Sequence, residues 1–444
     1  MSTNVVDPNL LFKRKVALLL LIILFILPVV FVSYKGFLKS EQSRLGIPAV
    51  TTWFHRFKKS DADGINSLLL TDNGYLVLGD TSPSDRNSFV KELDFNGTPL
   101  WSKTLQSNIN MTKTVGVVLN ETYLISYISI LNNTQTKPNV ITGFSVKIDK
   151  QTHRTLDRST QVFKSIAHTT QGYIGVGEHN KLFMYDENGD IIWEKRYREG
   201  FYFTGINTRY VIAKYEISRG KILKIVAAED NNFILMGQVK LAEKAKPSPW
   251  MFKIDKSGKV LWHKELQNNF MYPSDIVYSK DQSYLFIFND SRHRQVRCQK
   301  YSSSGILLWS KSYANNEKSL SWHVAQTGDG NYILTGASNQ ADQSKTMWLL
   351  KVDNTGELLW QRKRTSDIGD YPSTMIGTLD GGVLIGGKTT KQGFYVDKKY
   401  KEHVYKSFEL LDEGSWLLKL SMSGISPDPS FTFTSTNAWH KIDY

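Results

Sequence analysis

The sequence predicts an all-β fold, a seven-bladed β-propeller with six or eight blades as alternatives, preceded by one N-terminal transmembrane helix. One unit, Asp-x-x-Gly followed by Leu-Trp, recurs along the 444 residues, and aromatic residues make up 12% of the chain. Aromatic and β-branched side chains favour the pleated, half-buried surface of a sheet. The tryptophans of successive copies recur at a spacing of about 50 residues, which is typical of four-stranded propeller blades.

Each copy of this unit places a glycine four residues before a tryptophan. The pairs are Gly97 and Trp101, Gly189 and Trp193, Gly258 and Trp262, Gly305 and Trp309, and Gly356 and Trp360. Glycine accepts the positive φ of a tight turn, and the aspartate caps that turn. We interpret the tryptophan as a structural residue of the outer strand that packs neighbouring blades together. Its replacement by alanine in a buried setting costs about 3–5 kcal/mol.

A second half-unit, typified by residues 71–80 and 378–388, predicts two further strands joined by a tight turn. The copies predict seven blades, the second with Leu156 in place of tryptophan and the seventh without its last strand. They span about residues 64–105, 112–160, 163–198, 210–266, 272–313, 320–365 and 372–424. We expect Trp53, in the segment 51–57, to supply the missing strand, which would remove an exposed edge. Residues 432–434 offer a competing strand.

The N-terminus carries an unbroken apolar run from Val16 to Val32, at the short limit for a membrane-spanning helix. A basic cluster at residues 13–15 precedes it, and cytoplasmic flanks carry excess Lys and Arg. We predict an uncleaved signal-anchor with the bulk of the chain outside the cytoplasm; a cleaved signal peptide with a long apolar region is the alternative. The predicted parts are a cytoplasmic tail at 1–15, a span at 16–32, a tether at 33–46 and a propeller at 47–444.

The formal net charge of +13 favours anionic partners, and outside the cytoplasm these are lipid head groups or acidic glycans rather than nucleic acid. The densest basic stretch predicts an anion-binding patch of Arg292, Arg294, Arg297 and Lys300. The alternative is that these side chains are solvated strand ends. Insertions at residues 200–220 and 389–410 interrupt the repeats, and long loops in compact domains are often functional.

Residues for common chemistries are missing from the sequence. The only cysteine, Cys298, excludes an intramolecular disulfide and suits a buried position. None of the nine histidines has zinc-motif spacing, and there is no Gly-x-Ser-x-Gly or phosphate-binding glycine loop. The repeated aspartates lack the late bidentate Glu of a calcium loop. We therefore predict no catalytic, cofactor-binding or metal-binding residues and no cofactor.

The Asp-x-x-Gly-x-Φ-Leu-Trp unit, where Φ is apolar, resembles the PQQ-like propeller repeat of bacterial envelope proteins over most of residues 50–425. The resemblance implies a bacterial inner-membrane protein whose propeller faces the periplasm or exterior. Quinoprotein dehydrogenases of similar fold carry a quinone, calcium and a vicinal cysteine pair, which one cysteine cannot supply. The outer-membrane assembly lipoprotein, a scaffold, has a lipobox cysteine and more blades than this chain.

Together these features predict a membrane-anchored, non-enzymatic binding or assembly scaffold for an envelope protein or glycan. The alternative is a periplasmic quinoprotein-like or carbohydrate-acting enzyme, because a catalytic site assembled from distant loops leaves no local motif. A sensor is a third hypothesis. Its predicted cytoplasmic tail at 1–15 is too short for a signalling domain, so a sensor of this kind requires a partner subunit.

Overall fold

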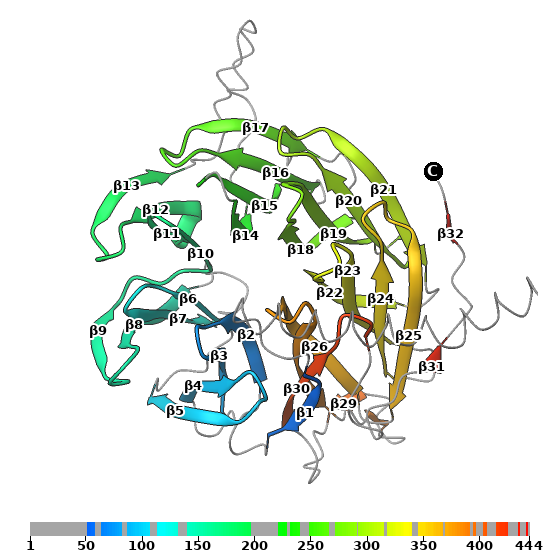
Figure 1. Ribbon diagram of the computed structural model, residues 1–444, viewed down its shortest axis with the longest axis horizontal. Coiled ribbons are helices and arrows are strands. Elements are labelled where there is room, and N and C mark those ends of the chain that lie inside the picture. The colour runs from blue at the N-terminus through cyan, green and yellow to red at the C-terminus, as the bar shows by residue number, and fades with distance from the viewer. Residues whose placement is uncertain are drawn as a thin grey trace, which may run out of the picture. The chain divides into compact units, whose positions relative to one another are not determined.

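The protein is a seven-bladed β-propeller whose blades are antiparallel sheets arranged around one axis (Figure 1). The computed structural model describes residues 51–57, 64–81, 87–106, 113–131, 140–196, 221–228, 231–239, 248–265, 271–290, 292–314, 318–339, 345–366, 369–390, 394–396, 403–405, 414–424, 434–435 and 441–442. The prediction of seven blades is confirmed.

Blades 1 to 4 contain four strands each, which follow one another from the inner to the outer edge of the sheet. Blade 1 is β2 (Gly64–Leu70), β3 (Gly74–Asp80), β4 (Asn87–Asp94) and β5 (Pro99–Gln106). Blade 2 is β6 (Lys113–Val118), β7 (Thr122–Leu131), β8 (Val140–Asp149) and β9 (Thr155–Ser159). Blade 3 is β10 (Ser165–Thr169), β11 (Gly172–Val176), β12 (Lys181–Tyr185) and β13 (Ile191–Arg196), with the 3-10 turn η2 (Glu178–Asn180). Blade 4 is β14 (Lys221–Ala227), β15 (Phe233–Val239), β16 (Ser248–Ile254) and β17 (Val260–Glu265).

Blades 5 to 7 draw additional strands from both ends of the chain. Blade 5 is β18 (Met271–Tyr278), β19 (Tyr284–Asp290), β20 (Gln295–Tyr301), β21 (Leu307–Ala314) and the added β32 (Lys441–Ile442). Blade 6 is β22 (Lys318–Gln326), β23 (Tyr332–Asn339), β24 (Lys345–Val352), β25 (Leu358–Ser366) and the added β31 (Thr434–Ser435). Blade 7 is β26 (Gly369–Gly377), β27 (Val383–Thr390), β30 (Gly414–Leu420) and β1 (Trp53–Arg56).

The ring closes through β1, the N-terminal strand of the propeller. It pairs antiparallel with β30, with Trp53 opposite Lys419 and Arg56 opposite Trp416. The backbone N–H of Phe57 extends the ladder by donating to the Ser415 carbonyl at 2.8 Å. The predicted position of Trp53 on the outer strand of the last blade is confirmed, and the blade gains the strand that its own repeat lacks.

The competing C-terminal segment does not add to blade 7. Thr434 lies in β31, which pairs with the outer strand β25 of blade 6, and β32 pairs with β21 of blade 5. A strand added there satisfies backbone groups that the outer edge of a sheet would otherwise present to solvent.

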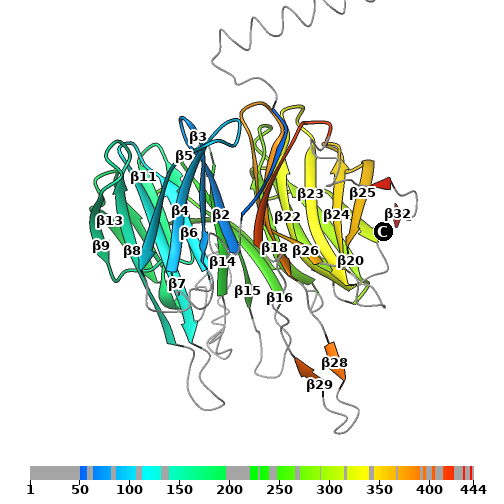
Figure 2. The ribbon, with the colours of Figure 1, turned by 90° about the horizontal axis from the view of Figure 1, so that it is seen from below.

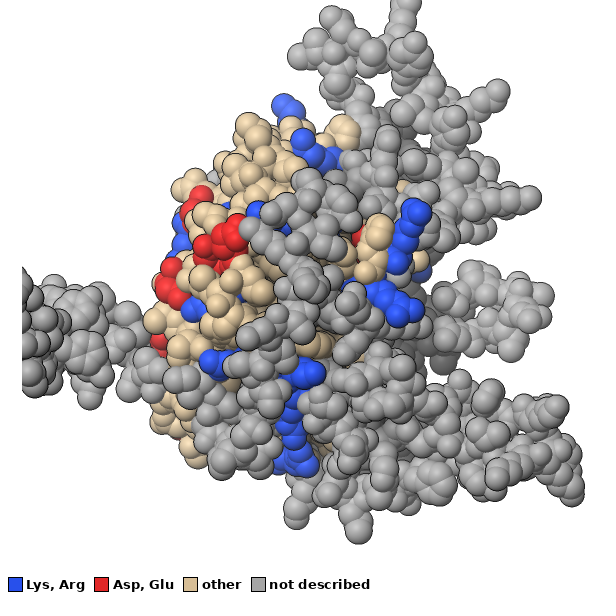
Figure 3. Space-filling view, turned by 90° about the vertical axis from the view of Figure 1, so that its right-hand side faces the viewer, with Lys and Arg blue, Asp and Glu red and all other residues tan. Residues whose placement is uncertain are grey.

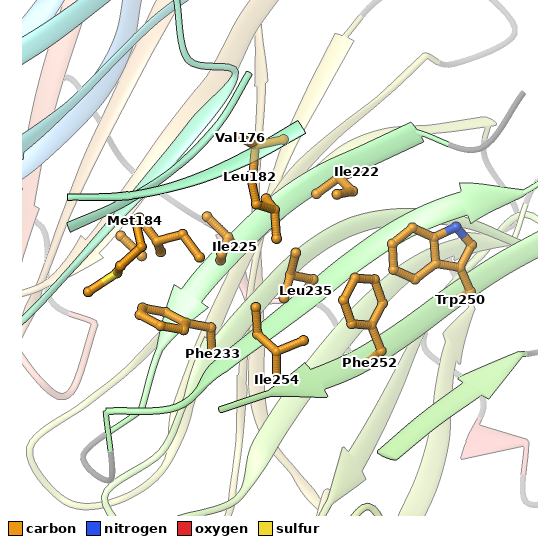
Figure 4. Packing of buried hydrophobic residues seen from close by; sticks show 12 residues of the cluster. Val176, Leu182, Met184, Ile222, Ile225, Phe233, Leu235, Trp250, Phe252 and Ile254 are labelled. Carbon is orange, nitrogen blue, oxygen red and sulfur yellow. The ribbon is translucent and has the colours of Figure 1, made fainter. Parts of the chain in front are cut away.

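The hydrophobic core lies between the faces of neighbouring blades. Figure 4 shows the layer between blades 3 and 4, where Leu182 of β12 meets Ile225 of β14 and Leu235 of β15. Leu182 and Leu235 are 0% exposed. Burial of apolar area in such layers stabilises the fold by roughly 25 cal/mol for each Å². Equivalent layers occur at the other blade junctions, so each blade depends on both neighbours.

The disc has two faces that differ in their connections (Figure 2). We call the turn face the side where the repeated tight turns join first to second and third to fourth strands. We call the loop face the opposite side, where second strands connect to third strands and each blade connects to the next. The hairpin of β28 (Phe394–Val396) and β29 (His403–Tyr405) belongs to the predicted insertion 389–410 and projects from the loop face. The predicted insertion 200–220 lies outside the described residues.

The chain divides into two compact units, Met1–Thr51 and Thr52–Tyr444. The predicted membrane segment 16–32 falls outside the described residues, so its prediction stands untested. Among the residues that the structure does describe, none belongs to a helix of the length and apolarity needed to cross a bilayer.

Candidate functional site

The repeated Asp-x-x-Gly turns are fully explained by local hydrogen bonds. In blade 6 the Asp353 Oδ1 accepts backbone N–H groups of Thr355 and Glu357, each at 2.8 Å, and Gly356 has φ +84°. The turns of blades 1 and 4 repeat this pattern at Asp94 and Asp255. These aspartates cap turns, as their spacing predicts. No group of three or more His, Cys, Asp or Glu suited to a metal occurs among the described residues.

Most of the repeated tryptophans pack against the Asp-x-x-Gly turn of the next blade in the ring. Trp262 Nε1 donates to the Ser303 carbonyl of blade 5 at 3.0 Å, and its ring covers Gly305 so closely that a Cβ there would lie 2.9 Å from it. The same arrangement joins Trp53 to Gly97 and Trp360 to Gly424. It also joins Trp193 to Gly258 and Trp309 to Gly356. Glycine is needed at each such position for two reasons: the backbone has positive φ, and the tryptophan ring of the preceding blade leaves no room for a Cβ.

Blade 2 departs from this pattern on both of its sides. His153, with φ 56°, takes the place of the turn glycine, and the Trp101 ring of blade 1 stacks on it with centroids 4.3 Å apart. On the other side Leu156 replaces the tryptophan and is 58% exposed. The Lys147 side chain covers Gly189 of blade 3 instead and donates to the Asn188 carbonyl at 2.8 Å. The degenerate repeat therefore keeps contact with both neighbouring blades, through a stacked histidine on one side and a lysine on the other.

The repeated tryptophans are only half-buried, which lowers the effect expected from their removal. Trp262 retains solvent contact, whereas Trp322 on the inner strand of blade 6 is 0% exposed. We therefore expect Trp262→Ala to lower the free energy of unfolding by about 2 kcal/mol, less than a fully buried position would give. Trp322→Ala is the matched comparison and should cost about 3–5 kcal/mol. Urea titrations of both variants test this, and equal losses would contradict it.

Buried lysines on the third strands form a second set of structural contacts. Lys351 Nζ lies 2.6 Å from Asp329 Oδ2 of its own blade and donates to the Met422 carbonyl of blade 7 at 2.8 Å. Lys300 does the same with Asp281 at 2.7 Å and with Asn354 of blade 6. The signal is present in the sequence, because a lysine stands two residues before the turn aspartate in several copies, but the repeat pattern alone assigns it no role.

The four residues of the predicted anion-binding patch do not form one site. Arg292 and Arg294 are exposed in the connection between β19 and β20, on the loop face. Arg297 is half-buried, and its Nε donates to Ser312 Oγ at 3.2 Å. Lys300 is 2% exposed and paired with Asp281 at the turn face. A role for Lys300 in surface anion binding is therefore wrong, and only the two arginines share an exposed surface.

A different basic cluster, which was not predicted from the sequence, lies beside the axis at the loop face, on blades 2 to 4. Lys113 begins β6, Lys164 precedes β10, and Lys221 and Lys224 belong to β14, so the four come from the inner strands of blades 2, 3 and 4. We call them the lysine arc. Their positive charges act on one another: burial, Lys224 and Lys164 lower the pKa of Lys113 to about 8. Burial also lowers the pKa of Lys164, and Lys221 adds to this effect while Glu178 opposes it.

The inner strands of blades 2, 3 and 4 place these lysines on one part of the ring. The strand β10 contacts both β6 and β14, so blade 3 lies between blades 2 and 4. Lys113 and Lys221 begin the inner strands β6 and β14, and Lys164 directly precedes β10, so all three stand at the loop-face ends of strands that line the axis. The arc is therefore gathered toward the axis and is not spread over the rim.

Asp275 marks the side of the arc nearest blade 5. It is 3% exposed and forms an ion pair with Lys224, and the backbone N–H groups of Ile276 and Val324 donate to it at 2.8 and 3.1 Å. His323 Nδ1 lies 3.7 Å from its Oδ2. Burial alone would raise the pKa of Asp275, but Lys224 and His323 outweigh it and hold that pKa well below its usual range.

Acidic side chains occur at both faces, and Asp275, Asp290 and Asp370 lie toward the loop face. On the side of the disc seen in Figure 3, Asp and Glu groups gather at the left, toward the turn face, and the Lys and Arg groups extend along the rim toward the loop face at the right. Turn-face aspartates such as Asp281, Asp329 and Asp380 pair with lysines of the structural set. Of the arc, Lys224 pairs with Asp275, and Glu178 acts on Lys164.

Burial of Lys113 and its repulsion by neighbouring lysines predict a pH-dependent stability difference. The pKa of Lys113 lies below that of an unfolded lysine, so the unfolded state binds more protons between about pH 8 and 10.5 and stability rises with pH there. Lys113→Met should stabilise the protein at pH 7 by the order of 1 kcal/mol, allowing for solvent screening, and the gain should vanish by about pH 10.5. Urea titrations at pH 7 and 10 measure this, with Lys259→Met as a turn-face control. A difference that does not change with pH would refute it.

Comparisons with known proteins assign this chain to no family. No family model matches the chain. No curated protein sequence matches it. Solved structures similar to it include virginiamycin B lyase from Staphylococcus aureus with quinupristin (9% identity, TM-score 0.47, covering 83% of this chain and 99% of that one). Hydrazine synthase of Kuenenia stuttgartiensis is 8% identical with a TM-score of 0.46, and the match covers 78% of this chain and 96% of that one. BBS1N in complex with ARL6DN is 9% identical with a TM-score of 0.47, and the match covers 86% of this chain and 100% of that one. Identities this low describe the fold alone.

Proposed function

We propose that this protein is a single-pass, membrane-anchored propeller outside the cytoplasm, a non-enzymatic scaffold that binds an envelope protein on its loop face. The observation that carries the proposal is the lysine arc, four cations from three adjacent blades that meet at one face of the disc. Arg292 and Arg294 are exposed on the same face. The partner that fits this face has an acidic surface, since complementary charge speeds encounter and disfavours wrong partners.

The two faces support a division of roles. Charged groups of the turn face are used internally, as in the pairs of Lys351 with Asp329 and Lys419 with Asp380. The loop face also has internal pairs, such as Lys224 with Asp275 and Arg364 with Asp370, but there burial and neighbouring lysines lower the pKa of Lys113, which lowers stability without a partner. Groups that oppose stability are expected where function requires them.

The geometry at His323 argues against its use as a general base. Its Nε2 has no hydrogen-bond partner among the described residues, and Asp275 lies near the other ring nitrogen, as in a general base. However, the Nε2 atom is buried, so a solute cannot reach it without movement of its surroundings. A general base must come within hydrogen-bond distance of the proton that it removes.

Anchoring and cell-envelope location follow from the N-terminal apolar run and from the resemblance of the repeat to PQQ-like envelope propellers. We infer that residues 16–32 hold the protein in the bacterial inner membrane. Fractionation should recover the full chain in membranes after alkaline extraction and a chain that begins at Thr51 in the soluble fraction. Recovery of the full chain in the soluble fraction would contradict the anchor.

Site-specific crosslinking tests the binding face. A photo-reactive residue at Arg294 samples the loop face of blade 5, and one at Ser304 samples the turn face of the same blade, where both positions are exposed. We expect a crosslink to an acidic envelope protein from position 294 only, weakened by salt and by Lys221→Glu. A crosslink from position 304 alone, or one indifferent to salt, would contradict the proposal. A crosslink to a glycan and none to a protein would show that the partner is a glycan and would contradict the proposed protein partner.

A further inference from the structure

We propose that the lysine arc binds an oxyanion group carrying two negative charges, a phosphate or a pair of carboxylates, at the loop-face end of the propeller axis. This proposal makes the proposed function more specific. It rests on that function only for the identity of the molecule that carries the oxyanion. The site is formed by Lys113 of blade 2, Lys164 of blade 3, and Lys221 and Lys224 of blade 4.

The charges of the arc match such a group. Two carboxylates act on its members: Asp275 pairs with Lys224, and Glu178 acts on Lys164. Among the described residues, the four lysines and these two carboxylates leave two positive charges without compensation. A divalent oxyanion would neutralise them and satisfy several ammonium donors at once, and such charge-assisted hydrogen bonds are the stronger class.

Solvent can reach the site. Lys221 is exposed, Lys164 is half-buried, and the Lys224 side chain is 40% exposed. Lys113 keeps exposed surface at the start of β6, although surrounding protein is close enough to lower the pKa of its ammonium group. Lysine side chains are long and flexible, so their ammonium groups can converge on an anion that arrives from solution. Protein around the site lowers the local dielectric and strengthens attraction to the anion compared with an isolated surface lysine.

The arrangement is unfavourable unless an anion binds. Burial lowers the pKa of Lys113 and of Lys164, and neighbouring lysines add to the effect, while Glu178 opposes it at Lys164. A structural lysine of this protein has the opposite surroundings, as Lys351 shows with its carboxylate at 2.6 Å. The arc therefore differs from the structural lysines in the feature that an anion would correct.

Calorimetry of the full chain in detergent tests the proposal, with pyrophosphate and succinate as separate probes. At pH 8.5 much of Lys113 is neutral, so we expect binding to draw protons from the buffer, seen as a heat that changes with the buffer's ionisation enthalpy. The double variant Lys113→Met, Lys221→Met should weaken binding at least tenfold. The matched turn-face control, Lys256→Met with Lys259→Met, should leave it unchanged. Lys113→Arg should keep binding and lose the proton uptake, because arginine stays protonated.

Each outcome is decisive. Binding of either probe with this variant pattern supports the site and identifies the preferred oxyanion. No binding of either probe, or equal weakening by the turn-face control, overturns it. If the probes fail while the Arg294 crosslink persists, the oxyanion site is wrong and the scaffold stands. If the probes bind while no partner crosslinks, the site stands and the scaffold is wrong.

Discussion

A chain that begins at residue 58 should lose its cooperative fold, whereas a chain that begins at Thr51 should keep it. The shorter chain lacks β1 and leaves β30 as an unpaired edge. It also lacks three aromatic side chains: Phe57, which is 6% exposed, Phe54, which packs against the core of blade 7, and Trp53, which covers Gly97. At about 1.5–3 kcal/mol for each buried side chain, the loss is roughly 4–6 kcal/mol.

A loss of that size approaches the whole stability of an ordinary domain, about 5–15 kcal/mol. It also falls on the junction where the ends of the ring meet, because the Trp53 Nε1 donates to the Phe95 carbonyl of blade 1 at 3.1 Å. Near-ultraviolet circular dichroism and urea unfolding of the two chains measure the effect. Equal urea midpoints would show that β1 is dispensable and that blade 7 closes the ring with three strands.

The fold could be predicted because each blade repeats its own local chemistry. A glycine that must adopt positive φ and a tryptophan four residues later identify a turn and an outer strand, whatever the rest of the chain does. Closure could be predicted for a related reason, since blade 7 lacks a last strand and Trp53 stands alone before blade 1. Counting the strands of each repeat thus predicts the pairing of β1 with β30, which are far apart in sequence.

The four residues of the predicted basic patch do not lie together, because residues close in sequence are far apart along an extended strand. Residues Gln295–Tyr301 form β20, which runs from the loop face to the turn face. At about 3.3 Å per residue, Arg294 and Lys300 are carried roughly 20 Å apart. Alternation then turns successive side chains to opposite faces of the sheet. Arg297 and Lys300 accordingly meet Ser312 and Asp281, two unrelated partners.

The lysine arc escaped prediction for the opposite reason. Lys113, Lys164 and Lys221 are about 50 residues apart, one blade period each, and each looks like an ordinary surface lysine in its own segment. They come together only because inner strands of successive blades begin at the same face. Such a site can be found from sequence by aligning the starts of the inner strands, which requires the blade boundaries to be known to within a residue or two.

Asp380→Ala should be among the most destabilising single substitutions in the protein, at about 3–5 kcal/mol, because it leaves a buried ammonium group without its carboxylate. Lys419 Nζ lies 2.9 and 2.8 Å from the two Asp380 oxygens, and the side chains are 0% and 3% exposed. The double variant Asp380→Ala, Lys419→Met should recover much of the loss, since an apolar chain replaces the stranded charge. Asp329→Ala is the matched control, because Asp329 is 31% exposed and water can solvate its lysine.

The pH dependence separates a stranded charge from lost packing. Burial lowers the pKa of Lys419 even though Asp380 acts to raise it, so removal of Asp380 must lower that pKa further. In Asp380→Ala the unfolded state then binds the extra proton over a wider alkaline range, and its stability must rise with pH up to about 10.5. The deficit against the natural protein should shrink between pH 7 and 9.5 in urea titrations. A constant deficit, or a double variant no better than the single one, would assign the loss to packing, because a cavity has no proton to release.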